Sequence, residues 1–246
     1  MASRFQAKLE YDGTDFLGFQ IQADGRTVQG ELEDALARLE HGQRVPVLGA
    51  GRTDSGVHAS GQVIAFDLDW ALGVEKLQRA INANLSRDVA LRGLASAAED
   101  FHPRFSAKGR CYEYRIFNAP VRSPRLERIA WQVWQELNLD EMNLASESLI
   151  GRQDFGTFGR APDKSSNTIR TIRTAHWHLM EGLLLFEIEA DAFLYRMVRS
   201  IVGMLKQVGA GEISGEEFVT RKNAADRSKC GQTAPAKGLS LVEVRY

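Results

Sequence analysis

The residues best suited to chemistry lie in one short stretch, GAGRTDSGVHASGQVIAFD, which runs from Gly49 to Asp67 between two apolar runs. Arg52 and Asp54 are two residues apart, so in an extended chain both side chains leave the same face. A neighbouring cation keeps a carboxylate in its charged form. The pattern therefore indicates an ionised Asp54 that acts as a base, a nucleophile or a metal ligand, although Asp54-Ser55-Gly56 is also typical of a purely structural turn.

The neighbours of Asp54 narrow these alternatives. No second carboxylate and no histidine cluster lies close to it in the sequence, so we expect no metal site. A retaining glycosidase would need a partner acid beside the nucleophile, whereas the nearby groups are Arg52 and His58. A more distant acid stays open as an alternative.

Composition indicates the class of protein and its compartment. The 246 residues are 43% hydrophobic and 26% charged, as is ordinary for a globular protein with a sizeable core. The sequence contains no run of about eighteen apolar residues such as a membrane span needs, and its start lacks a secretory apolar core. Cys111 and Cys230 fit neither a disulfide framework nor a zinc motif. We therefore expect a cytoplasmic protein with no membrane segment.

Charge is balanced over the whole chain but not along it. Lys and Arg number 31 against 32 Asp and Glu, which gives a net charge of −1. The segment 101–128, in contrast, carries seven basic residues against two acidic ones, and aromatic residues are interleaved with them. Recognition of looped or single-stranded RNA uses basic side chains to contact phosphates and aromatic rings to stack on bases. The plainer interpretation is a strand whose basic face is simply solvated.

Hydrophobic periodicity predicts the elements that must position these residues. Strands are expected over residues 5–11, 45–51, 62–67, 89–97, 110–117, 129–134, 168–179, 183–190 and 239–246. Helices are expected after a Thr27 cap, over 74–85, 140–150 and 193–208, and after a capping box that opens at Ser214. Helices placed between pairs of strands favour an α+β fold. We expect two similar lobes of mainly antiparallel sheet covered by helices, over residues 1–107 and 108–246.

One glycine on the 193–208 helix is unusual. Gly203 lies in the middle of the helix, where glycine costs about 1 kcal/mol relative to alanine. We therefore expect another part of the protein to approach the helix closely at this point.

Five separated motifs resemble, in order, those of the bacterial tRNA pseudouridine synthase A family. The motifs are Gly18-Phe19-Gln20, Gly51-Arg52-Thr53-Asp54-Ser55-Gly56-Val57-His58-Ala59, Tyr112-Glu113-Tyr114, Phe193-Leu194-Tyr195-Arg196-Met197-Val198-Arg199 and Ala234-Pro235-Ala236-Lys237-Gly238-Leu239. The resemblance extends over nearly the whole chain.

The resemblance implies an isomerase that acts on tRNA without a cofactor. Such enzymes break the N-glycosidic bond of a uridine, turn the uracil and rejoin it through carbon 5. The expected substrate is the anticodon stem-loop, at uridines 38, 39 and 40, and the expected assembly is a homodimer. Asp54 takes the place of the catalytic aspartate, either as nucleophile at C1′ or C6 or as the base that removes a sugar proton.

The same resemblance assigns roles to other residues of a central basic cleft. Tyr112 is expected to contact the target base, and Arg199 to form an ion pair with Asp54. Arg52 is expected either to stack in the place of a flipped-out uridine or only to form a salt bridge.

Two further residues are expected to bind substrate rather than to catalyse. His58 orders the loop or touches the RNA backbone, and Arg110 belongs to the basic segment. The alternatives are a non-catalytic RNA-binding protein on the same fold and an N-ribosidase that releases uracil.

Overall fold

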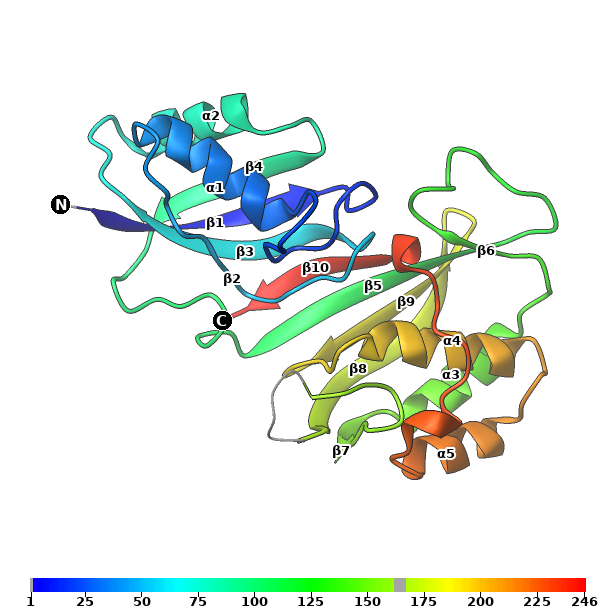
Figure 1. Ribbon diagram of the computed structural model, residues 1–246. Helices are drawn as coiled ribbons and strands as arrows, with labels where there is room; N and C mark the ends of the chain where they lie inside the picture. The colour runs from blue at the N-terminus through cyan, green and yellow to red at the C-terminus, as the bar shows by residue number, and fades with distance from the viewer. Residues whose placement is uncertain (1, 162–166) are drawn as a thin grey trace. The chain divides into compact units, whose positions relative to one another are not determined.

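The computed structural model describes residues 2–161 and 167–246 and divides the chain into two compact units (Figure 1). The first unit contains the chain up to Lys108 together with Leu241–Tyr246. The second unit contains Gly109–Ser240. Each unit has its own strands and helices and is described by itself.

The strands of the first unit are arranged around β1, which is antiparallel to both of its neighbours. Their bounds are β1 (Ser3–Tyr11), β2 (Leu48–Gly49), β3 (His58–Leu68), β4 (Val89–Ser96) and, at the end of the chain, β10 (Leu239–Arg245). β1 pairs with β3 on one side and with β4 on the other, β2 pairs with β3, and β10 follows β3 in the strand order. Phe5, Ala7 and Leu9 of β1 alternate with more accessible residues, so one face of these strands builds the core.

Two helices cover the strands of this unit (Figure 1). They are α1 (Val28–Leu39) and α2 (Val74–Asn84), and they contact each other. The predicted cap of α1 is confirmed, because Oγ1 of Thr27 accepts a hydrogen bond from the Gly30 N–H. The apolar face of α1 is formed by Val28, Leu32, Ala35 and Leu36, which are buried, whereas Leu39 at the end of the helix is only half-buried.

The second unit is built on four antiparallel strands in the order β5-β9-β8-β7. The strands of this unit are β5 (Gly109–Asn118), β6 (Trp131–Val133), β7 (Gly151–Asp154), β8 (Ile169–Met180) and β9 (Leu183–Ala190). Glu181 and Gly182 join β8 to β9 with φ of 51° and 79°, in a two-residue hairpin turn that falls between the strands predicted over 168–179 and 183–190. β6 is the exception to the antiparallel pattern, since it runs parallel to β5.

Helices of the second unit pack on these strands and on one another. They are α3 (Leu139–Glu147), α4 (Met197–Gly209) and α5 (Gly215–Asn223), with short 3-10 turns at Arg227–Lys229 and Ala236–Gly238. α3 contacts α4, α5 and β8. The predicted cap of α5 is confirmed, because the Ser214 side chain accepts from the Glu217 N–H.

The predicted α+β class with mainly antiparallel strands is therefore confirmed. Among the helices of residues 2–161 and 167–246, none has the length and apolar character needed to cross a bilayer.

Several boundaries differ from those expected. The strand predicted over 45–51 is only Leu48–Gly49, because Pro46 has no N–H to donate to a ladder. The helix predicted from residue 193 begins at Met197, because Arg196 has a left-handed backbone with φ of 59°. β7 was not predicted at all, since its four residues GRQD carry no apolar signal.

The last strand was expected in the second lobe, but its residues Leu241–Tyr246 belong to the first unit. Two contacts explain this placement. A Cβ added to Gly61 of β3 would lie 2.0 Å from the carbonyl oxygen of Val242, and the Lys108 N–H donates to the carbonyl of Arg245 at 2.7 Å.

Candidate active site

Asp54 opens a tight turn in the first unit. The Val57 N–H donates to the carbonyl of Asp54 at 3.1 Å, and Gly56 has φ of 76°. Ser55 and Gly56 are therefore the central residues of the turn, as the sequence predicts. Asp54 is half-buried and Arg52 is exposed. An ion pair between these two side chains stays a prediction.

Thr53 anchors the turn to the rest of the unit. Its carbonyl accepts from the Phe19 N–H at 3.1 Å, and its buried Oγ1 lies 2.8 Å from the Tyr11 hydroxyl. Gly18 has φ of 101°, and a Cβ at this position would lie 2.8 Å from the Thr53 carbonyl oxygen. The motif that begins at Gly18 thus holds the residue directly before Asp54. No role for Tyr11, Gly18 or Thr53 was predicted from the sequence, in which the motif at Gly18 is the available signal.

A network of charged groups around Arg26 supports the segment at Phe16, which contacts the Asp54 turn. The Phe16 carbonyl accepts from the Ser55 hydroxyl at 3.2 Å, and the Arg26 guanidinium lies 4.1 Å from the centre of the Phe16 ring. Arg26 also donates to Asp88 at 2.6 and 2.8 Å and to Glu31 at 2.7 Å. The hydrogen bonds from Arg26 hold the pKa of the Asp88 carboxyl below its usual range, although partial burial opposes this.

His58 contacts the segment that precedes Phe16. The Gly13 N–H donates to Nδ1 of His58 at 3.0 Å, and Oδ1 of Asp12 lies 3.2 Å from the same nitrogen. A Cβ on Gly13 would lie 2.0 Å from the carbonyl oxygen of Val57, so the two chain segments touch here. His58 therefore has a loop-ordering contact, which is one of the two roles that the sequence suggests for it. Its contact with RNA stays a prediction.

In the second unit, Tyr112 lies at the edge of the core. It pairs with Ile188 of β9, and its ring and that of Phe193 form a T-shaped contact at a centroid distance of 5.0 Å and an interplanar angle of 84°. Tyr114 and Ile116 lie on the same face and are fully buried, whereas Tyr112 is half-buried. Its ring is thus braced on one side and still partly accessible.

Arg199 is hydrogen-bonded to the segment that follows α5. Its Nε donates to the carbonyl of Ala234 at 2.8 Å, and the Ala234 N–H donates to the carbonyl of Arg199 at 3.0 Å. The Tyr114 hydroxyl donates to the carbonyl of Pro235 at 2.8 Å. Burial raises the pKa of Tyr114, and the nearby charge of Arg199 opposes this rise. Three family-like motifs therefore meet inside the second unit.

Two glycines permit these contacts. A Cβ on Gly203 of α4 would lie 1.7 Å from the carbonyl oxygen of Gln232, so the close approach expected from the sequence is confirmed and the group that approaches is this carbonyl. A Cβ on Gly238 would lie 2.6 Å from the Tyr114 ring. Both positions exclude a side chain for steric reasons.

Arg110 begins β5 and is half-buried. Its Nη1 donates to the carbonyl of Asp191 at 2.9 Å, which ties β5 to the loop before α4. Within the same basic segment, Arg115 pairs with Glu113 at 2.6 Å. The basic residues that stay exposed are Arg104, Lys108, Arg122, Arg125 and Arg128.

In the part of the chain that the structure describes, a single group of three or more histidine, cysteine or acidic side chains is close enough to share a metal ion. It consists of His176, His178 and Glu187 of the second unit. Asp54 is not among these residues.

Comparison with known proteins identifies the family. A family model described as tRNA pseudouridine synthase matches residues 7–106 and 145–246. The chain belongs to the tRNA pseudouridine synthase family. Four of the five motifs lie in the matched ranges, and Tyr112-Glu113-Tyr114 lies between them.

Individual relatives in the tRNA pseudouridine synthase family match the chain from end to end. A protein of Pseudothermotoga lettingae is 43% identical over 244 residues, with 99% of each chain covered. One of Geobacillus kaustophilus is 41% identical and covers 100% of this chain and 95% of the relative. One of Latilactobacillus sakei is 38% identical with both chains fully covered. All three carry the name tRNA pseudouridine synthase A.

Proposed function

We propose that this protein is an isomerase that converts uridine to pseudouridine in tRNA. The observation that carries the proposal is the full-length similarity to relatives named tRNA pseudouridine synthase A, together with an Asp54 turn that is held in place by the family-like motif at Gly18. The catalytic function is favoured over a non-catalytic RNA-binding protein, because that protein would have no need for a carboxylate so firmly positioned.

The proposed reaction balances without a cofactor or a catalytic metal. The bond between C1′ and N1 breaks, the uracil turns, and a bond between C1′ and C5 forms. N1 gains a proton and the hydrogen on C5 leaves as a proton, so nothing is oxidised or reduced. An ionised Asp54 serves as nucleophile at C1′, as nucleophile at C6, or as base toward the sugar.

Other residues have supporting roles in this proposal. Tyr112 contacts the target base through the ring that Phe193 braces. Arg199 forms an ion pair with Asp54 in the active enzyme. Arg52 is exposed, and its planar guanidinium is suited to stack where the uridine has left the helix. We include His58 and Arg110 as contacts to the RNA backbone.

The finer substrate assignment is uridines 38, 39 and 40 of the anticodon stem-loop. Three adjacent targets require recognition of RNA shape and backbone rather than of base sequence. We propose that the protein works in the cytoplasm as a homodimer, with tRNA bound in a basic cleft that has Asp54 at its floor.

Tritium release tests the reaction. A tRNA labelled with tritium at C5 of its uridines is incubated with the full-length protein, and tritium in water and free uracil are both measured. The isomerase releases tritium without free uracil. Free uracil indicates an N-ribosidase, and tRNA binding without either product indicates an RNA-binding protein. Mapping of pseudouridine along the tRNA then tests positions 38, 39 and 40.

Asp54→Asn tests the site. We expect tritium release to fall by at least about 10²-fold, because the neutral amide is neither a base nor a nucleophile. Binding of tRNA should stay within a few-fold, since the side chains have the same shape. The exposed Asp24→Asn in the same unit is the matched control and should keep full activity. Normal turnover by Asp54→Asn would remove Asp54 from the mechanism.

A further inference from the structure

One face of the strands in the second unit carries polar groups that the proposed reaction does not use. Along β8 and β9, Trp177 and Phe186 are paired and buried on the face that forms the core. His176, His178 and Glu187 alternate with them and therefore share the opposite face. His176 is the direct cross-strand partner of Glu187.

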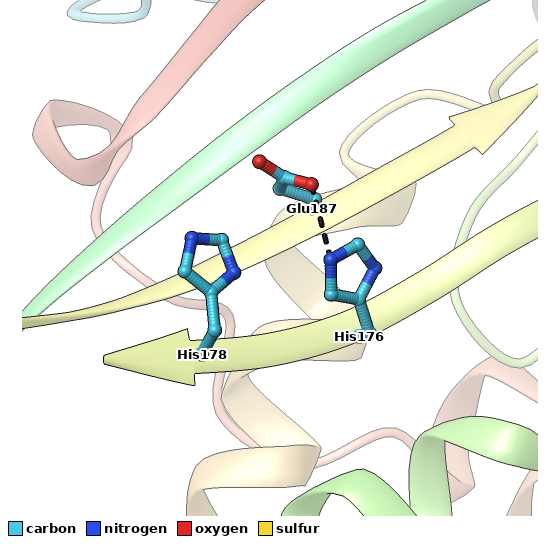
Figure 2. Close-up of side chains that lie close together, drawn as sticks. All are labelled: His176, His178 and Glu187. Atoms are coloured by element: carbon cyan, nitrogen blue, oxygen red, sulfur yellow. Dashed lines mark ion pairs between the residues drawn. The ribbon is translucent and has the colours of Figure 1, made fainter. Parts of the chain in front are cut away.

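The three side chains converge, as Figure 2 shows. Nε2 of His176 lies 3.1 Å from Oε2 of Glu187, and the two imidazole rings are stacked at a centroid distance of 5.6 Å. The ring of His178 turns one nitrogen toward the other two side chains (Figure 2). One ligand atom from each residue lies within 4.8 Å of those of the other two.

One ring nitrogen of His178, Nδ1, is buried without a hydrogen-bond partner in the described part of the chain, residues 2–161 and 167–246. A buried polar atom without a partner is unfavourable by roughly 1–3 kcal/mol. A bound cation would satisfy this atom if the nitrogen coordinates it.

The charges around the group also favour a cation. Glu113 of β5 lies directly opposite Glu187 in the register of β5 and β9. Like charges at directly opposed positions are destabilising. The Glu113 carboxylate is paired with Arg115 at 2.6 Å, and an added cation at Glu187 would offset the second carboxylate.

We propose that His176, His178 and Glu187 bind a divalent transition metal ion, with Zn²⁺ the best fit. Two imidazoles and one carboxylate form a known zinc ligand set, whereas Mg²⁺ and Ca²⁺ prefer oxygen ligands. Ligand atoms about 2.0–2.2 Å from a zinc ion lie at most about 4.4 Å apart. The present ligand atoms lie within 4.8 Å of one another, so a modest side-chain rotation brings them into range. A fourth position stays open to water.

The metal site lies away from the residue proposed to contact the target base. Glu187 is adjacent in sequence to Ile188, the strand partner of Tyr112, so Glu187 and Tyr112 lie on opposite faces of their sheet. The bound ion joins β8 to β9 and stabilises this hairpin. A metal ion at this site differs from the expectation of no metal, which rests on the sequence neighbours of Asp54. The His-Trp-His spacing at 176–178 is the signal in the sequence that points to this second location.

Metal titration tests the proposal on the full-length protein after removal of metals by a chelator. We expect calorimetry to show one Zn²⁺ bound per chain, and Co²⁺ to give the visible absorption of a site with nitrogen ligands. The thermal unfolding midpoint should rise with Zn²⁺, because the ion binds the folded state.

Variants locate the bound ion. His178→Ala and Glu187→Gln should each weaken Zn²⁺ binding by at least about tenfold and abolish the rise in the unfolding midpoint. The exposed His41→Asn is the control and should bind like the parent; asparagine tolerates the φ of 53° at this position. Circular dichroism verifies folding, and Glu187→Gln keeps the side-chain shape if His178→Ala fails to fold. Absence of Zn²⁺ binding, or binding that both variants retain, would overturn the proposal.

Discussion

Thr53 is the residue through which the first unit positions Asp54. Its carbonyl accepts a hydrogen bond from the Phe19 N–H, and its hydroxyl is hydrogen-bonded to the Tyr11 hydroxyl. The backbone of Gly18, which has no side chain, packs against the Thr53 carbonyl. Asp54 itself is only half-buried. The contacts of Thr53 therefore help to place Asp54, and accurate placement is a general requirement for a group that must meet a substrate atom.

We expect Gly18→Ala to reduce activity more than it reduces tRNA binding. Alanine is strained at φ of 101°, and its Cβ would lie 2.8 Å from the Thr53 carbonyl oxygen. The strain is about 1–3 kcal/mol, and a displaced Asp54 loop should lower the rate of tritium release by about 10–10²-fold. Urea unfolding and tritium release measure the two effects.

Gly51→Ala is the control for unfolding, because a Cβ at this position meets nothing within 4 Å. Its free energy of unfolding should change by at most about 1 kcal/mol. Equal stability and equal activity of Gly18→Ala and the parent would show that the loop does not need the close approach.

At the scale of elements, α4 is an unusually enclosed helix. Eleven of its thirteen residues are buried, including Gly203 and Lys206. Lys206 pairs with Glu212 at 2.6 Å, so its charge is satisfied. The helix is covered along Gly203 by the segment that contains Gln232 and Ala234, and this segment also accepts the hydrogen bond from Arg199.

Two glycine-to-alanine variants should therefore have opposite effects on stability. Gly203→Ala puts a Cβ 1.7 Å from a backbone carbonyl oxygen, so we expect a loss of about 1–3 kcal/mol despite the better helix propensity of alanine. Gly215→Ala, at the start of α5, meets nothing within 4 Å and should add up to about 1 kcal/mol. Thermal or urea unfolding compares the two, and a stabilised Gly203→Ala would contradict the packing of α4.

At the scale of the whole molecule, the nearly neutral charge conceals an uneven distribution. The net charge is −1, yet the exposed residues Arg122, Arg125 and Arg128 follow one another within seven positions of the second unit. A protein of this charge is not drawn to nucleic acid by its overall field. Its binding to tRNA must rely on local contacts between its basic side chains and the phosphates of the RNA backbone.

We expect tRNA binding to weaken steeply with salt. Each phosphate contact releases condensed counterions, so Arg125→Gln should reduce the slope of log affinity against log salt by about 0.7–0.9. Arg79→Gln is the control, an exposed arginine on α2 outside the basic segment. Filter binding from low to moderate ionic strength measures the slopes. Salt-insensitive binding would contradict recognition through the basic segment.

Sequence by itself determined the local elements, because their signals are local. The period of α1, its Thr27 cap, the Glu181-Gly182 hairpin and the turn after Asp54 each rest on residues within a few positions of one another. The family-like motifs can be recognised for the same reason, since each is a run of consecutive residues. They indicate the family and Asp54 as the candidate catalytic residue.

The tertiary structure decided everything that depends on residues distant in sequence. Gly18 faces Thr53, Gly203 faces Gln232, and the end of the chain joins the first unit, although no local pattern specifies these partners. The hairpin register likewise brings Glu187 to His176. The physical reason is that such contacts are selected by packing and hydrogen bonding in the folded chain, where the space left by a missing Cβ or the partner of a buried nitrogen first becomes defined.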